Sequence, residues 1–173
     1  HILLINKPSG LLSLSGKNPA NRDSVHHRLA MDFPSALMIH RLDLGTSGIM
    51  VLALNKAANA QLCDQFKNRS VSKSYTAIVD GRLAEVKGSI DVPIIKYKEN
   101  FPYQKVCYET GKSAQSAYEV IGYLPELDAS RLMLAPITGR THQLRIHCQA
   151  IGHSILGCDL YASKAVGQKA DRL

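Results

Sequence analysis

Apolar residues along the chain gather in short runs divided by turn residues, a pattern typical of a protein rich in β-strands. Residues 2–5 and 49–54 are short apolar runs that predict buried strands. Residues 74–79 alternate polar with apolar or aromatic side chains, as a strand does when one face is buried. Further strands are predicted at residues 90–97, 105–109, 114–122 and 131–135. These runs lie too close together for helical crossovers, so an antiparallel or mixed sheet is expected.

Helical spacing is predicted for residues 23–31 and, more clearly, for residues 56–68. In the second segment the residues expected to face inward lie near i, i+4, i+7 and i+8: Ala58, Leu62, Gln65 and Phe66. In the first segment Pro34 stops the pattern soon after its end. Both segments are expected to flank the strands.

A third helix is predicted further along the chain, where Thr141 can act as its N-terminal cap. Gly152 follows its expected end near residue 151. Leu144 and Cys148 share its apolar face, and Arg145 is expected on the opposite side. Together the elements predict an α+β fold with a mixed, mostly antiparallel sheet core flanked by helices and loops.

Length and composition fit a single domain spanning residues 1–173. Of the 173 residues, 45% are hydrophobic, which is enough to build a core. No apolar run approaches the roughly 20 residues of a membrane span, so we expect a cytoplasmic protein, and we expect a monomer. The first residue is not methionine and the last residues are polar and lysine-rich. The domain is therefore expected to be incomplete at both ends.

Cysteine and histidine spacing does not support a metal site. The cysteines are scattered, without the paired spacing of zinc sites or redox-active pairs: Cys63, Cys107, Cys148 and Cys158. His142 and His147 do not share a helix face as an i, i+4 pair would. We therefore expect reduced thiols and no metal.

The charge balance indicates a polyanionic partner. The net charge is +7, and lysines and arginines that neutralise phosphates gain affinity by releasing counterions. Many basic proteins bind no nucleic acid, so charge alone does not decide the matter. The position of the charges does more, because several basic residues fall within the segments that carry the candidate chemistry: Arg41, Lys73, Arg140 and Arg145.

The segment from His40 to Gly48 sets one acidic residue, Asp43, among basic, hydroxyl and glycine neighbours, directly before the predicted strand at 49–54. A carboxylate at the mouth of a rigid strand can be held still and kept partly dry, as a nucleophile or a base requires. Asp43 is therefore the first candidate for a catalytic residue.

Three segments resemble the signatures of the RluA family of pseudouridine synthases. His40 to Gly48 resembles its HRLDxxTSG motif, whose aspartate is the catalytic residue. Lys73-Ser74-Tyr75 resembles its second motif, which supplies a tyrosine, and residues 139–147 resemble its third, which supplies a basic partner for the aspartate. The segments occur in the family's order, and the likeness runs from about residue 2 to residue 161.

The resemblance implies a role for each candidate residue. Asp43 would be catalytic, Tyr75 would stack on uracil and assist at C5, and Arg145 would hold the carboxylate ionised through paired hydrogen bonds. A base inside folded RNA must be rotated out to reach Asp43, and Arg41 would stack in its place. Looser contacts with the flipped nucleotide and the RNA backbone are expected from His40, Arg140, Thr141 and His142.

The residues alone leave other roles open: a structural ion pair for Arg145, a half-buried strand aromatic for Tyr75, and a phosphate contact for Arg41.

The resemblance implies the pseudouridine synthase fold, with a central RNA-binding cleft. Segments 104–112 and 152–157 resemble the branch of the family that modifies both large-subunit (23S) ribosomal RNA and a transfer RNA anticodon stem-loop.

The expected function is therefore an isomerase that converts uridine to pseudouridine in structured RNA. The reaction changes no oxidation state and releases no group, so no cofactor is expected. Two other functions stay open. An RNA N-glycosidase would break the same bond but would need a water-activating group beside Asp43, and no second acid lies in the three segments. A non-catalytic RNA-binding relative would be expected to lack Asp43, Tyr75 or Arg145.

Overall fold

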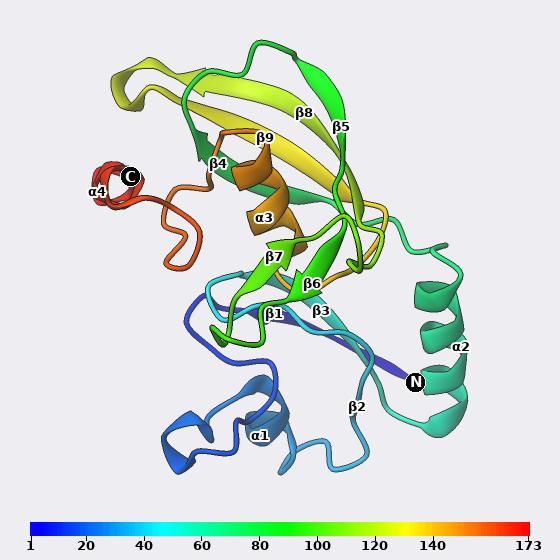
Figure 1. Ribbon diagram of the computed structural model, residues 1–173. Helices are drawn as coiled ribbons and strands as arrows, with labels where there is room; N and C mark the ends of the chain where they lie inside the picture. The colour runs from blue at the N-terminus through cyan, green and yellow to red at the C-terminus, as the bar shows by residue number, and fades with distance from the viewer. The chain divides into compact units, whose positions relative to one another are not determined.

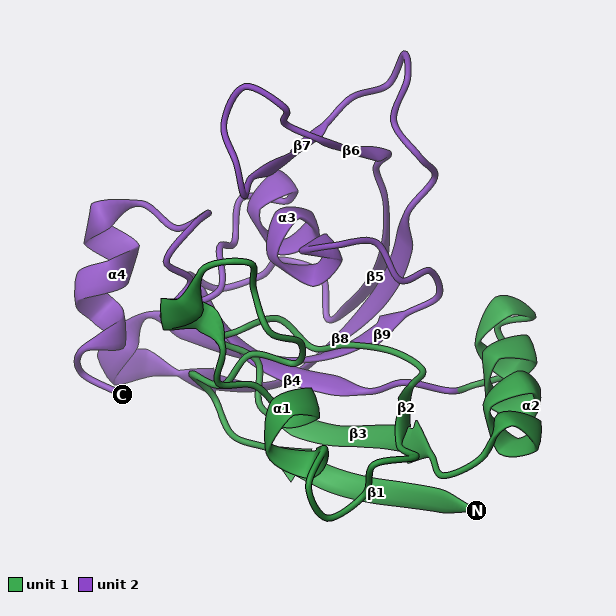
Figure 2. Ribbon diagram, turned by 90° about the horizontal axis from the view of Figure 1, so that it is seen from below, with its two compact units in different colours: residues 1–71 green, residues 72–173 purple.

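The computed structural model describes residues 1–173, which form two compact units, residues 1–71 and 72–173 (Figure 2). A single domain spanning both units stays a prediction. The first unit contains these elements (Figure 1): β1 (Ile2–Lys7), α1 (Val25–Leu29), β2 (Leu37–Met38), β3 (Gly48–Ala53) and α2 (Lys56–Lys67), with a 3-10 turn at Pro19–Asn21 before α1.

The strands of the first unit form an antiparallel sheet in the order β1-β3-β2. Side chains alternate along β1, so that Leu3 and Ile5 lie on the face that also buries Lys7. On β3, Met50 and Leu52 are fully buried. Both strands predicted in this part of the chain are therefore confirmed, and the sheet anchors the loop that enters β3.

The predicted helix at residues 56–68 is confirmed as α2. The Asn55 side chain caps it by accepting a hydrogen bond from the Ala58 N–H at 2.8 Å. Ala58 is buried, but Gln65, expected to face inward, is exposed, so the buried stripe is narrower than the spacing suggests. Cys63 on the same helix is also exposed. α1 is shorter than predicted and begins after a serine cap.

The second unit contains six strands and two α-helices: β4 (Tyr75–Asp80), β5 (Lys87–Asp91), β6 (Ile94–Lys96), β7 (Gln104–Val106), β8 (Gln115–Leu124), β9 (Ala129–Pro136), α3 (Gln143–Ala150) and α4 (Lys164–Ala170). One sheet has the order β4-β9-β8-β5, and a second pairs β6 with β7 (Figure 1). A 3-10 turn at Pro125–Leu127 joins β8 to β9. All pairings between the named strands are antiparallel, in agreement with the mostly antiparallel core expected.

The single strand predicted at residues 90–97 is wrong, because this segment divides into β5 and β6, which belong to different sheets. Pro93 lies between the two strands, and its carbonyl accepts the Cys107 N–H at 3.0 Å, just after β7. A proline has no N–H to give to a sheet ladder. The chain therefore leaves the first sheet here and enters the second.

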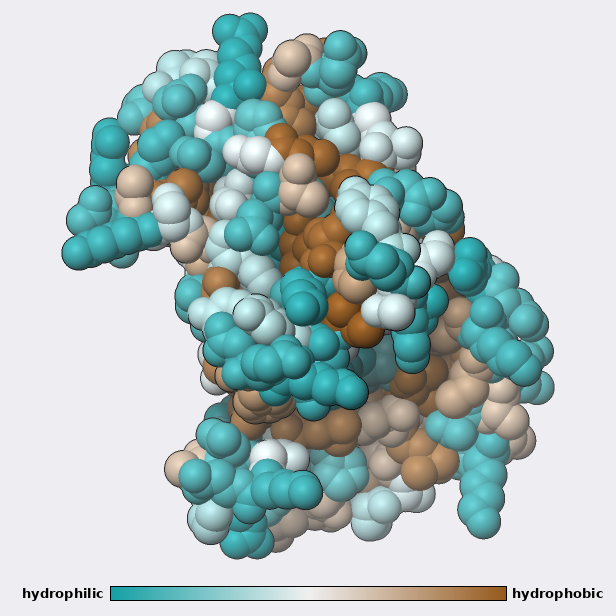
Figure 3. Space-filling view, viewed as in Figure 1, coloured by the Kyte–Doolittle hydropathy of each residue, from teal (hydrophilic) through white to brown (hydrophobic).

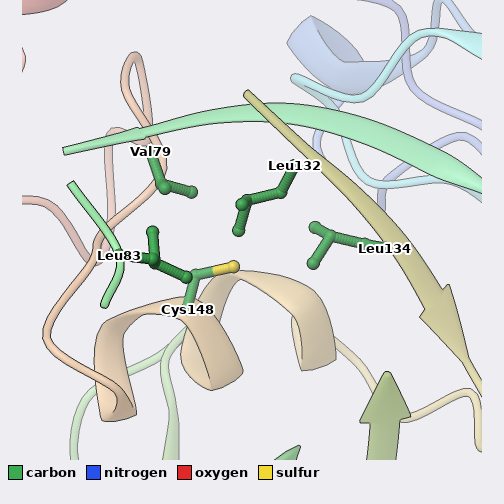
Figure 4. Packing of buried hydrophobic residues seen from close by; sticks show 5 residues of the cluster. All are labelled: Val79, Leu83, Leu132, Leu134 and Cys148. Atoms are coloured by element: carbon green, nitrogen blue, oxygen red, sulfur yellow. The ribbon is translucent and has the colours of Figure 1, made fainter. Parts of the chain in front are cut away.

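The helix α3 packs on the four-stranded sheet through a buried apolar cluster (Figure 4), formed by Val79, Leu83, Leu132, Leu134 and Cys148. Burial raises the pKa of the Cys148 thiol to about 12, and the neighbouring Cys158 adds to this effect. Cys148 therefore serves as a small apolar side chain in this core.

The start of α3 differs from the prediction. Its N-cap residue is His142, in the left-handed region with a φ of 56° and without a side-chain cap, so Thr141 is not the cap. Gly152 follows the helix with a φ of +83°, which fits the predicted end. Arg145, expected on the side away from the core, has a side chain that is only 16% exposed.

The low exposure of Arg145 is explained by a second apolar cluster, which covers α3 on the side away from the four-stranded sheet. There Ile146 packs with Ile94 of β6 and with Tyr161, from the segment that follows the helix. The helix is therefore covered by the sheet, by the β6–β7 pair and by the returning chain. Arg145 is therefore partly covered, although Gln149, near the end of the helix, is exposed.

A further helix, α4, forms where no element is predicted. Its first turn is capped by Ser163, whose hydroxyl accepts from the Val166 N–H at 3.4 Å. Val166 packs in a third cluster with Leu127 and Leu156. On the face drawn in Figure 3 the residues over α4 are mostly hydrophilic. None of the helices combines the length and the apolar composition needed to cross a bilayer.

His147 of α3 is fully buried, and neither of its ring nitrogens is in hydrogen-bonding geometry with a partner. Burial lowers the pKa of His147, against smaller opposing contributions from the Val92 backbone and the Asp91 carboxylate. The folded protein therefore favours the neutral imidazole.

We expect the free energy of unfolding to decrease as the pH falls below about 6.5, because the unfolded chain then binds a proton that folded His147 resists. His147→Leu should remove this contribution, which is at most about 1.4 kcal/mol between about pH 7.5 and 5.5. Urea unfolding at both pH values measures it, with the exposed His26→Leu as the control. An unchanged pH dependence in His147→Leu would contradict the expectation.

Candidate active site

Asp43 lies in the loop between β2 and β3, and hydrogen bonds fix the backbone on both sides of it. The buried Leu42 makes two bonds with one hydroxyl, since its carbonyl accepts from Ser13 Oγ at 2.7 Å and its N–H donates to that oxygen at 3.1 Å. The Leu44 carbonyl accepts the Gly10 N–H at 2.9 Å. The loop therefore holds its carboxylate-bearing residue in place, as a catalytic group requires.

Lys7, at the end of β1, supports this loop from a position that is only 1% exposed. Its ammonium donates to the carbonyls of Leu11 at 2.7 Å, Pro8 at 3.0 Å and Leu44 at 3.3 Å. Burial lowers the pKa of Lys7, and the charge of Asp43 opposes that shift. The buried ammonium therefore ties the loop down and sets a positive charge near the carboxylate.

His40 and Arg41 precede Asp43 and have different surroundings. The His40 ring stacks on Phe66 of α2 with 4.9 Å between ring centroids, and its Nε2 accepts the Val51 N–H at 3.1 Å. A neutral His40 therefore carries its proton on Nδ1. Arg41 is exposed. The RNA contacts expected of both residues stay predictions.

Tyr75 opens β4 and packs, half-buried, against the apolar cluster under α3. Lys73 donates to the Thr138 carbonyl at 3.4 Å, which ties the approach to β4 to the loop before α3. Leu144, the neighbour of Arg145, packs against the same cluster. One apolar core therefore holds both Tyr75 and the helix that carries Arg145.

A buried glutamine shapes the loop that carries Arg140 and Thr141. Gln143 is 4% exposed, and its amide makes four hydrogen bonds: Oε1 accepts from Thr138 Oγ1 at 2.7 Å and the Arg140 N–H at 2.9 Å, and Nε2 donates to the Gln115 carbonyl and Ser116 Oγ, both at 2.9 Å. Its hydrogen-bonding capacity is thus fully used. The network fastens the loop to β8.

His142 and Arg145 both contact Tyr161, in the segment after α3. The Tyr161 hydroxyl bonds His142 Nδ1 at 2.7 Å, and the Arg145 guanidinium carbon lies 5.5 Å from the Tyr161 ring centroid. Arg145 also donates from Nε to Cys158 Sγ at 3.2 Å and from a terminal nitrogen to the Asp159 carboxylate. The guanidinium is therefore held in a defined orientation.

The structure groups the predicted residues by unit. The first unit carries His40, Arg41 and Asp43, and the second carries Tyr75, Arg140, Thr141, His142 and Arg145. That Asp43 meets Tyr75 and Arg145 around a single cavity, within a central RNA-binding cleft, stays a prediction.

Sequence reasoning misses four residues that hold these side chains in place: Lys7, Gln143, Asp159 and Tyr161. A signal for Lys7 exists, because alternation along β1 puts it on the buried face with Leu3 and Ile5. Asp159 and Tyr161 lie in no periodic segment, and their contacts depend on the return of the chain over α3.

The chain matches the family model described as RNA pseudouridylate synthase over residues 1–150. It is 52% identical to a dual-specificity RNA pseudouridine synthase, RluA, of Yersinia pestis, over 100% of this chain and 84% of that protein. It is 49% identical to the RluA of Escherichia coli (strain K12), over 100% of this chain and 78% of that protein.

Solved structures agree with this similarity. Human RNA Pseudouridylate Synthase Domain Containing 1 superposes with a TM-score of 0.81 at 29% identity, covering 99% of this chain and 69% of that one. Human RNA Pseudouridylate Synthase Domain Containing 4 gives a TM-score of 0.76 at 28% identity, covering 94% and 66%. The fold expected from the sequence is thereby confirmed.

We expect Lys7→Met to lower the free energy of unfolding by about 2–3 kcal/mol, because the loop carbonyls lose a charged donor while the apolar stem is kept. Urea denaturation followed by circular dichroism measures the change. Lys17→Met, at an exposed position, is the matched control. Equal stability of the two variants would show that the buried ammonium does not organise the loop.

Proposed function

This chain belongs to the RNA pseudouridylate synthase family, and we propose that it isomerises uridines in structured large-subunit ribosomal RNA and in a transfer RNA stem-loop. As a member of the family it is an isomerase that converts uridine in RNA to pseudouridine. The observation that carries the proposal of two substrates is the 52% identity, over the whole chain, to a dual-specificity RNA pseudouridine synthase. The net charge of +7 supports binding to a polyanion.

The reaction sets the requirements for the site. The bond between uracil N1 and ribose C1′ breaks, the base turns in place, and a bond forms between C5 and C1′. The proton on C5 is lost and N1 gains one, so the product has the same atoms as the substrate. Such a site needs an ionised carboxylate, a cation that aims it, a group that assists at C5, and a pocket that excludes water.

We propose that Asp43, Arg145 and Tyr75 meet these requirements. Asp43 acts on the reacting nucleoside from a loop whose backbone is fixed by hydrogen bonds, including the bond from the Lys7 ammonium to the Leu44 carbonyl. Arg145 has five N–H donors, so its bonds to Cys158 and Asp159 are compatible with a grip on the Asp43 carboxylate. Tyr75 stacks on the uracil ring and assists in removing the C5 proton.

RNA recognition is proposed for the residues around this set. The target nucleotide leaves the stack at a cost of a few kcal/mol, and Arg41, which is exposed, stacks in the gap. His40, Arg140, Thr141 and His142 contact the flipped nucleotide and the backbone. The fixed rings of His40 and His142 favour such a role, because a pre-oriented side chain loses little entropy on binding. The cytoplasmic location and the monomeric state stay predictions.

Asp43→Asn should reduce pseudouridine formation by at least about 10³-fold, because the amide keeps the shape of the side chain but supplies no negative charge. RNA labelled with tritium at uracil C5 reports turnover, since isomerisation releases the label to water. Binding of the same RNA should change less than about threefold.

Asp32→Asn, at an exposed position outside the candidate site, is the matched control. Substantial tritium release by Asp43→Asn would remove Asp43 from the reaction. Free uracil in the wild-type reaction, measured by chromatography, would instead indicate an N-glycosidase.

A further inference from the structure

The chain that leaves α3 folds back over the helix and brings residues 157–161 to the side of Arg145. The return is anchored at Tyr161, whose carbonyl accepts from Gln149 Nε2 at 3.1 Å and from Ser154 Oγ at 3.3 Å. Gln149 belongs to α3 itself, so the position of the returning segment is tied to the helix that carries Arg145.

The segment contacts the guanidinium from three directions. Cys158 Sγ accepts from the Arg145 Nε–H at 3.2 Å, along one edge of the planar group. The Asp159 carboxylate accepts from a terminal nitrogen. The Tyr161 ring faces the guanidinium carbon at 5.5 Å from its centroid, within the range of a cation–π contact. Together these contacts restrict both translation and rotation of the group.

Tyr161 is itself held by several partners, so it provides a firm surface. Its hydroxyl bonds His142 Nδ1 at 2.7 Å and accepts the Gln104 N–H at 2.8 Å. Tyr103 packs edge-on against its ring, with 5.7 Å between centroids. One tyrosine therefore links β7, the first turn of α3 and Arg145.

We propose that Asp159 and Tyr161 are positioning residues, which set the orientation of the Arg145 guanidinium for its action on Asp43. The inference rests on the proposed function, because it gives Arg145 a role in the reaction. Neither residue needs to touch the substrate. A flexible arginine would have to be immobilised in each catalytic cycle, whereas this one is oriented before RNA binds.

Asp159 allows a sharp test because its side chain is 71% exposed. An exposed ion pair contributes little to folding, so Asp159→Asn should fold with an unchanged Tm. We expect its kcat to fall by about 10- to 100-fold, the size expected when a catalytic group is misplaced by about 1 Å. Its KM for RNA should stay within about threefold. Asp159→Glu restores the charge and should recover most of the activity.

The matched control is Asp171→Asn, an exposed carboxylate in the same unit, which should match wild type. If wild type releases tritium from the labelled RNA and Asp159→Asn keeps its full kcat or exceeds it, the positioning proposal fails alone. If wild type modifies none of the proposed RNAs, the proposed function fails instead.

A second pair of variants tests the role of the Tyr161 ring by a measurement that does not depend on enzyme activity. Tyr161→Phe keeps the ring beneath the guanidinium, and Tyr161→Leu removes it. In nitrogen-15 NMR spectra we expect a resolved Arg145 Nε–H signal in wild type and in Tyr161→Phe, assigned by its loss in Arg145→Lys. Broadening or loss of that signal in Asp159→Asn and Tyr161→Leu is expected. An Arg145 Nε–H signal in Asp159→Asn and Tyr161→Leu that is as sharp as in Tyr161→Phe and wild type would overturn the proposal.

Discussion

The candidate site of the second unit depends on how firmly one short helix is held. α3 has only eight residues, too few to be stable in isolation, and its structure therefore depends on packing. The sheet covers it through Cys148, the β6–β7 pair covers it through Ile146, and the returning chain covers it through Tyr161. Because the helix is covered on these sides, its polar residues are directed by contacts instead of by solvent.

The first unit fixes its part of the site by a different means. There the Lys7 ammonium, the Ser13 hydroxyl and the Gly10 N–H make hydrogen bonds with the backbone of Leu42 and Leu44, on either side of Asp43. These bonds fix the backbone that carries the acidic side chain. In the second unit the contacts act on the functional groups themselves, as they do at Arg145 and His142.

Elements in which the apolar residues recur with one regular spacing could be predicted from the sequence. β1, β3, β4 and α2 each have an apolar pattern of one kind, and the antiparallel arrangement follows from the short connections between strands. The division of residues 90–97 into β5 and β6 depends on where Pro93 falls relative to a partner strand, which periodicity does not report. α4 depends on Val166 meeting Leu127 and Leu156, which are distant in the chain.

In the candidate site, too, the sequence does not reveal contacts between residues that are distant in the chain. Motif resemblance selects Asp43, Tyr75 and Arg145, but it says nothing of the side chains that hold them. Thr141 has the chemistry of a helix cap, yet Gln143 draws the backbone into a different path, and His142 takes the cap position. The contacts around Arg145 come from Cys158, Asp159 and Tyr161, which follow no periodic pattern in the sequence. These contacts can therefore be identified only in the folded chain.

The contrast between two cysteines of this fold bears on how the protein can be labelled. Thiol-selective reagents such as maleimides attack the thiolate and need access to it. Cys148 is buried, with its pKa raised to about 12, whereas Cys63 lies exposed on α2. Brief treatment at neutral pH should therefore label Cys63 and spare the core, and replacing the partly exposed Cys107 by serine would confine an optical reporter to the first unit.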